Sequence, residues 1–132
     1  MPGFPIMIVD DDQIYSYMAN KMIMATGLAG KITIHQNGAE AWDFLQSILK
    51  AHEVLPKIIF LDINMPNMNG WEFLFKICPL LKKTGEKTRV YLVSSSQDEN
   101  DLEQSRKFDC VFGYLVKPVL SHTFHEILAS NH

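Results

Sequence analysis

Cysteine is scarce in this sequence, because Cys78 and Cys110 are the only two among 132 residues and they do not form a C-x-x-C pair. A disulfide-stapled scaffold or a zinc site needs more cysteines at closer spacings, so the sequence disfavours both classes. We therefore expect both cysteines to be reduced thiols packed in the core.

Clusters of lysine and arginine are also missing, and the formal net charge is −3, which disfavours a nucleic-acid-binding surface. Apolar runs such as 57–61 fall far short of the roughly 18 residues of a membrane helix. The N-terminus lacks the basic-then-apolar pattern of a signal peptide. We expect a cytoplasmic protein that contacts neither nucleic acid nor membrane directly.

The composition is 47% hydrophobic and 20% charged, which is typical of a chain that folds around a core. A length of 132 residues suits one domain and leaves no room for a second folded one. We therefore predict a single domain over residues 1–132, without an appended output domain.

Short apolar runs alternate with segments of helical periodicity along the whole chain. Parallel strands joined by helices need right-handed crossovers, so five such units predict a doubly wound α/β sandwich. The expected strands are 6–9, 31–35, 57–61, 89–93 and 111–116, and a helix is expected after each of them.

The first and third helices carry the clearest local signals. Apolar residues at spacings of four, four and three predict the buried face of the first helix, which comprises Ile14, Met18, Met22 and Ala25. Pro79 should kink or end the third helix, because proline removes a backbone donor and restricts the residue before it.

The fourth and fifth helices have weaker signals. Ser96 and Glu99 have the spacing of a capping box at the start of the fourth helix, and Ser121 can cap the fifth. Leu102 and Phe108 alone mark an inner side of the fourth helix. Such thin packing suits a mobile or partner-contacting element.

Reactive side chains follow the predicted strands. The acidic triplet 10–12 follows the first strand, Asp62 the third, Ser94 the fourth and Lys117 the fifth. Ligands of such sheets bind at the carboxyl ends of the strands. We therefore expect these side chains to converge at one edge of the sheet.

Three carboxylates at one edge, those of Asp10, Asp11 and Asp62, would repel one another unless a cation lies among them. Mg²⁺ prefers such oxygen ligands, whereas zinc and copper favour histidine or cysteine. An aspartate beside such an ion can attack a phosphoryl donor, so Asp62 is the candidate nucleophile. Lys117 and the Ser94 hydroxyl can bind the phosphoryl oxygens.

Simpler interpretations exist for Asp12, for the acidic triplet as a whole and for Tyr114. Asp12 is better suited to cap the first helix than to bind metal. An isolated acidic triplet would more often form a solvated turn or a helix cap, and only its combination with Asp62 and Lys117 favours a site. Tyr114 could be an ordinary half-buried residue of the fifth strand.

Four segments together resemble the response-regulator receiver domain of two-component signalling. They are Val-Asp-Asp at 9–11, Leu-Asp-Ile-Asn-Met-Pro at 61–66, Ser94, and Lys-Pro at 117–118. Each lies at the end of a predicted strand, and the match covers nearly the whole chain. The resemblance implies a flavodoxin-like, CheY-like sheet in the order 2-1-3-4-5 with five helices.

The resemblance also implies a role for each site residue. Asp62 would be the phosphoacceptor and Lys117 the salt-bridging cation. The metal would be bound by Asp11 directly, by Asp10 through water and by the backbone carbonyl of Asn64. Ser94 and Tyr114 would be the switch residues. Ser94 stands where threonine is frequent and keeps the hydroxyl. Ser95 stands where alanine is usual, and its hydroxyl could alter the inward turn of Tyr114.

A receiver would take its phosphoryl group from a histidine kinase or a phosphotransfer protein, with Mg²⁺ as cofactor. It would not be an enzyme beyond catalysing its own phosphoryl transfer and hydrolysis. An effector would bind the face formed by the fourth helix, fifth strand and fifth helix, and a homodimer is a further option.

Three other function classes stay open. An aspartyl-phosphate phosphatase generally needs Asp-x-Asp, whereas this chain has Asp62-Ile63-Asn64. A flavin or nucleotide carrier needs a phosphate-binding loop after the first strand, where the acidic triplet would repel phosphate. A phosphorylation-independent interaction module is the third class, since fold alone does not settle function.

Overall fold

The computed structural model describes residues 3–65, 68–85, 87–95 and 98–131. Strands and helices alternate as the sequence predicts. They are β1 (Phe4–Val9), α1 (Gln13–Ala25), β2 (Ala29–His35), α2 (Gly38–Lys50), β3 (Ile58–Asp62), α3 (Gly70–Thr84), β4 (Arg89–Ser94), α4 (Glu99–Ser105), β5 (Val111–Val116) and α5 (Ser121–Ser130). Within those residues, no helix has the length and apolar character needed to cross a membrane.

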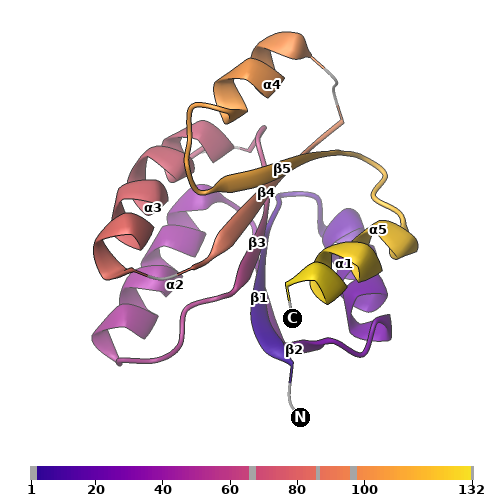
Figure 1. Cartoon of the computed structure of the whole chain (residues 1–132), viewed down its shortest axis with the longest axis horizontal. Coiled ribbons are helices and arrows are strands. Elements are labelled where there is room, and N and C mark those ends of the chain that lie inside the picture. Colours follow the sequence, from indigo (N-terminus) through magenta and orange to yellow (C-terminus); the bar gives the residue numbers. More distant parts are fainter. Residues whose placement is uncertain (1–2, 66–67, 86, 96–97, 132) are drawn as a thin grey trace.

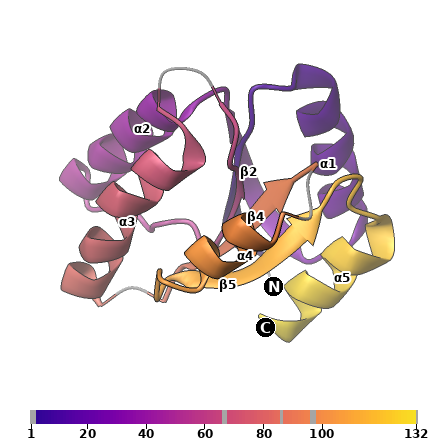
Figure 2. The same cartoon turned by 90° about the horizontal axis from the view of Figure 1, so that it is seen from above.

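All five strands are parallel and lie in the order β2-β1-β3-β4-β5, which confirms the order implied by the resemblance. Figures 1 and 2 show α2 and α3 on one face of the sheet and α1 and α5 on the other. The short helix α4 lies beside the edge strand β5 (Figure 2). Because β1 and β3 are central, their carboxyl ends lie in the middle of one edge of the sheet.

The core has two halves, one on each face of the sheet. Side chains alternate along a strand, so neighbouring residues enter different halves. Met7, Val9, Ile59 and Leu61 pack toward α2 and α3, whereas Ile6, Ile8, Ile58 and Phe60 pack toward α1 and α5. Every residue of β3 is buried. Burial on both faces therefore fixes the direction in which the ends of β1 and β3 point.

The predicted buried face of α1 is wrong for three of its four residues, and only Met22 packs against the core. Ile14 is 75% exposed and Met18 is 54% exposed, whereas Ser16, Ala19 and Ile23 are buried. The cap at Asp12 and the short connection from β1 set the rotation of the helix, and small residues allow a close approach to the sheet. Apolar spacing alone did not reveal that constraint.

The sequence predicts that Pro79 kinks or ends α3, and an end at this position is wrong, because the helix continues to Thr84. The proline leaves the carbonyl of Phe75 without its usual intrahelical donor. Phe75 and Pro79 both have exposed side chains, so this carbonyl lies on a side of the helix where water can satisfy it. The third helix begins at Gly70.

The two later helices begin differently from the prediction. Asp98 caps α4 by accepting from the backbone N–H of Asn100, and the proposed cap Ser96 lies outside the described residues. Phe108 follows α4 and is not part of its inner side. Ser121 is the first residue of α5, and the N-cap position is Leu120, which provides no side-chain cap.

The expectation of reduced cysteines is contradicted, because a disulfide joins Cys78 of α3 to Cys110. Cys110 immediately precedes β5. Spacing in the sequence could not reveal this bond, since the fold brings together two elements that are 32 residues apart.

Candidate functional site

Four strand ends meet at one edge of the sheet, as the sequence predicts. Parallel pairing sets Val9 of β1 beside Leu61 of β3 and Ser94 of β4 beside Val116 of β5. The next residues along β1 and β5, Asp10 and Lys117, are held by backbone bonds. The N–H of Asp10 donates to the His35 carbonyl at 2.9 Å, and that of Lys117 donates to the Ser94 carbonyl at 2.8 Å.

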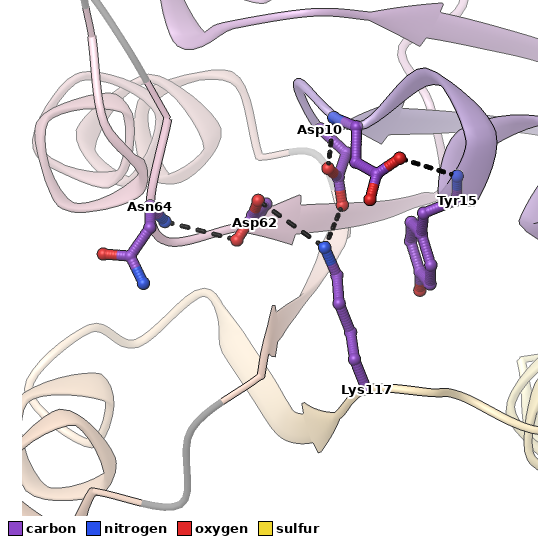
Figure 3. A network of polar contacts seen from close by, with 6 residues as sticks. Asp10, Tyr15, Asp62, Asn64 and Lys117 are labelled. Carbon is purple, nitrogen blue, oxygen red and sulfur yellow. Dashed lines mark hydrogen bonds and ion pairs between the residues drawn. The ribbon is translucent and has the colours of Figure 1, made fainter.

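Lys117 connects the two buried aspartates, as Figure 3 shows. Its Nζ lies 2.9 Å from Asp10 Oδ2 and 3.7 Å from Asp62 Oδ2. Asp10 is only 2% exposed, and its Oδ1 accepts the backbone N–H of Asp12 at 2.9 Å. Both oxygens of Asp10 are therefore engaged, whereas Asp62 has the looser ion pair.

The pKa values of Asp62 and Lys117 are both raised, for different reasons. Burial, and then the charge of Asp10, raise the pKa of Asp62 from 3.8 to about 6, although Lys117 and the Asn64 N–H oppose this rise. Burial lowers the pKa of Lys117, but its hydrogen bond to Asp10 and the nearby carboxylates outweigh that effect, so the pKa is raised. Lys117 therefore stays protonated, while the charge on Asp62 needs further compensation.

The acidic cluster fits a hard divalent cation. Asp10, Asp11 and Asp62 each offer a carboxylate oxygen, and these atoms all lie within 4.8 Å of one another. Asp11 is exposed, so a hydrated ion can approach from solvent. Oxygen donors with an open side suit Mg²⁺ or Mn²⁺ and do not match the histidine and cysteine ligands typical of zinc.

Asp12 caps α1, as predicted, and does not belong to the carboxylate cluster. Its side chain accepts the backbone N–H of Tyr15 at 3.0 Å. This cap directs the first turn of the helix toward the ends of β1 and β5.

Tyr15 is a site residue that the sequence reasoning missed. The Lys117 Nζ lies 4.3 Å from the centroid of its ring (Figure 3), a favourable cation–π distance. Its hydroxyl is buried and has no hydrogen-bond partner in the described part of the chain. Burial, and then the charges of Asp10 and Asp62, raise its pKa. The cap at Asp12 was a usable signal, because it places Tyr15 in the first turn of α1.

The two predicted switch residues lie on neighbouring strands. Ser94 is fully buried at the end of β4, and Tyr114 is half-buried on β5 beside Leu92. Alternation puts Ser94 and Leu92 on the same face of the sheet. Tyr114 packs against the core half under α2 and α3, the half that contains Leu92. Ser94 and Tyr114 therefore share one face of the sheet.

Backbone N–H groups fix Asn64 and Gly70 near the end of β3. The Asn64 N–H donates to Asp62 Oδ1 at 3.2 Å, and the Gly70 N–H donates to the Ile63 carbonyl at 2.8 Å. A Cβ on Gly70 would lie 2.7 Å from the Asp62 carbonyl oxygen. Glycine therefore lets α3 begin directly against the carboxyl end of β3.

Comparison with known families gives one match that spans most of the chain. The family model described as the response regulator receiver domain matches residues 6–129. A two-component response regulator from Cytophaga hutchinsonii has a similar structure, with a TM-score of 0.88 and 27% sequence identity over 99% of this chain and 98% of that one.

Two curated relatives differ in how much of their length the match covers. The probable methanogenesis regulatory protein FilR2 of Methanothrix harundinacea is 28% identical over 131 residues, which are 94% of this chain and 81% of that protein. A protein-glutamate methylesterase/protein-glutamine glutaminase of Thermotoga maritima is 37% identical over 93 residues, which are 70% of this chain but only 24% of that protein. The methylesterase activity named there belongs to a much longer chain.

Proposed function

Because the chain belongs to the response regulator receiver domain family, we propose that Asp62 is the residue on which it accepts a phosphoryl group. Receiver domains are the phosphoacceptors of two-component signalling, and they work with histidine kinases or phosphotransfer proteins. The observation that carries the assignment is the meeting of Asp10, Asp11, Asp62 and Lys117 at one edge of the sheet.

Receiver domains bind a divalent metal in an acidic pocket, and here Mg²⁺ is the proposed ion. Asp11 and Asp62 would be direct ligands, together with the backbone carbonyl of Asn64. Asp10 would act through water, because Lys117 and the Asp12 N–H already engage its two oxygens. When bound, the ion neutralises charge on the transferring phosphoryl oxygens.

Asp62 would be the nucleophile of the transfer reaction. One carboxylate oxygen attacks the phosphorus of a phosphohistidine, the P–N bond breaks, and the imidazole nitrogen leaves with the electron pair. Lys117 and the Ser94 hydroxyl would bind two oxygens of the resulting acyl phosphate. The chain would thus catalyse the transfer of the phosphoryl group to itself and the later hydrolysis of the acyl phosphate. It would not turn over a separate substrate.

The proposed output is a change on the face formed by α4, β5 and α5. Phosphate on Asp62 would draw in the Ser94 hydroxyl, and Tyr114 would turn inward on the same face of the sheet. An effector protein would bind this face. A second copy of the chain could bind the same face and form a homodimer. The exposed Ser95, which directly follows Ser94, would slow or redirect the inward rotation of the Tyr114 side chain.

We further propose a cytoplasmic location, because the ATP that supplies a histidine kinase is kept there. Within the given sequence, we assign residues 1–132 to one receiver unit.

Beryllofluoride, which mimics a phosphoryl group on a carboxylate, provides a test of the site. We expect the wild type to bind it only when Mg²⁺ is present, with binding followed by ¹⁹F NMR. Asp62→Asn should abolish the bound signal and Asp11→Asn should weaken it at least tenfold, because a direct ligand is lost. The matched control Asp12→Asn should leave it intact, since Asn also caps helices. Equal binding by wild type and Asp62→Asn would contradict the assignment.

A further inference from the structure

The disulfide between Cys78 and Cys110 lies beside an open pocket on the side of α3. The two Cα atoms are 5.6 Å apart, a usual separation for a disulfide. Both cysteines are half-buried and both line the pocket, whose volume is about 540 Å³. A molecule that enters the pocket therefore contacts both residues of the disulfide.

The pocket has an apolar lining and charged residues at its mouth. Leu74, Leu81 and Phe108 contribute apolar surface. Lys82 and Lys107 also line it and are exposed, as is Asp109, which gives the mouth an excess of one positive charge. This volume admits a small organic molecule, and the charge favours one that carries a carboxylate or sulfonate.

The disulfide ties the start of β5 to α3. Figures 1 and 2 show the segment between α4 and β5 running alongside α3. The ring of Phe108 in this segment stacks on Trp71 at 6.1 Å between centroids and meets Phe75 edge-on at 5.4 Å. The helix α4 itself has just one buried residue, Ser105. The disulfide and the ring contacts of Phe108 tie the segment that follows α4 to α3.

We propose that Cys78 and Cys110 form a redox-active site, which exchanges with anionic low-molecular-weight thiols through this pocket. The exchange attaches the α4–β5 segment, residues 98–111, to α3 or releases it. A thiolate attacks one Sγ, the Cys78–Cys110 bond breaks, and the released sulfur takes a proton from water. A second thiol attacks the mixed disulfide, frees the second cysteine and leaves as the small-molecule disulfide. Two electrons pass to the protein, and the disulfide form of the same thiol reverses the reaction.

This site goes beyond the proposed phosphoryl chemistry and involves none of its residues. Persistent structural disulfides are rare in the cytoplasm, where those that occur are usually transient or redox-sensing. With the cytoplasmic location proposed above, a pair that small thiols can reach is better suited to a switch than to a permanent staple.

The first experiment follows the thiol state of the native full chain. The protein is incubated with glutathione and glutathione disulfide at varied ratios, quenched with an alkylating agent and weighed by mass spectrometry. We expect complete, reversible conversion between disulfide and dithiol without denaturant. Reduction should lower Tm by about 10 °C and speed hydrogen exchange in residues 98–111, because the crosslink to α3 is lost. Reduction that requires denaturant, or failure to form the disulfide, would overturn the proposal.

The second experiment tests the entry route. Glutathione is anionic and 2-mercaptoethanol is neutral, so the ratio of their reduction rates reports the charge at the pocket mouth. Substituting Lys82→Gln and Lys107→Gln together should lower this ratio about threefold. The control pair Lys31→Gln with Lys50→Gln removes the same charge elsewhere and should leave the ratio unchanged. Equal ratios in the two double variants would contradict entry through this pocket.

Discussion

At the scale of single residues, the site depends on one cation shared unequally by two buried carboxylates. Asp10 takes the closer contact with Lys117 at 2.9 Å, and Asp62 is left at 3.7 Å. Burial, and then the charge of Asp10, raise the pKa of Asp62, and the more distant Lys117 only partly opposes this rise. A residue with an undercompensated charge is suited to gain a metal ion and a phosphoryl group.

Lys117→Gln should destabilise the protein at pH 7 by about 2 kcal/mol, because Asp10 would stay buried without its cation. Urea denaturation measures this change. Lys31→Gln, which removes an exposed lysine from β2, should stay within about 0.5 kcal/mol of the wild type. Equal stability of the two variants would show that Asp10 does not need the ion pair.

The pKa of Asp62 makes a pH-dependent prediction for the metal-free protein. Its folded pKa of about 6 lies above the ordinary 3.8, so the protonated form favours folding and ionisation opposes it. The stabilisation is full below pH 3.8 and is lost as the pH rises through about 6. Asp62→Asn, which cannot ionise, should therefore gain up to about 3 kcal/mol over the wild type at pH 8 in EDTA.

Denaturation in EDTA at pH 4, 6 and 8 measures this difference. We expect the gain of Asp62→Asn to shrink toward zero at pH 4, where both side chains are neutral. A stability difference that does not change with pH would contradict the raised pKa.

At the scale of elements, the sequence predicted the strands and their reactive ends better than the faces of the helices. Asp62 and Lys117 were identifiable because a parallel sheet brings its carboxyl ends to one edge. The face of α1 was missed because the cap and connection place small residues, Ser16 and Ala19, against the sheet. The bond from Cys78 to Cys110 depends on how α3 lies beside β5, which local patterns do not encode.

Gly70→Ala tests the contact between α3 and the end of β3. The new Cβ would meet backbone atoms of Asp62 and Ile63 at 2.7 and 2.8 Å, so the loop must shift. We expect a loss of about 2 to 4 kcal/mol in the free energy of unfolding and at least tenfold weaker beryllofluoride binding.

Gly85→Ala is the matched control, because it also replaces a glycine at an end of α3. Its Cβ would have no heavy atom of the described chain within 4 Å, but the φ of +73° is strained for alanine. The expected loss is about 1 kcal/mol, with unchanged beryllofluoride binding. Weakened binding by this control would mean that the effect of Gly70→Ala is not local.

At the scale of the whole molecule, the site edge and the α4–β5 segment are joined through β4 and β5. Ser94 is the last residue of β4 and pairs with Val116 of β5, two residues after Tyr114 on the same strand. The proposed phosphoryl signal would enter at one end of these strands, and the proposed redox control at the other. The two inputs would then act on the same segment from opposite ends of β5.

Ser94→Ala should separate binding at the site from the response of this segment. With Mg²⁺ and beryllofluoride, the wild type should change its hydrogen exchange in residues 98–116, and Ser94→Ala should bind while losing most of that change. Ser47→Ala, an exposed position on α2, should respond like the wild type. An unchanged response in Ser94→Ala would exclude the hydroxyl as the link.

The central claim is that Asp62 accepts a phosphoryl group with the help of Mg²⁺. The most direct measurement is the intact mass of the full chain after incubation with acetyl phosphate, with and without Mg²⁺, for the wild type, Asp62→Asn and Asp12→Asn. We predict one added phosphoryl group that requires Mg²⁺, is retained in Asp12→Asn and is absent from Asp62→Asn. A phosphoryl group on Asp62→Asn, or none on a wild type that also fails to bind beryllofluoride, would contradict the claim.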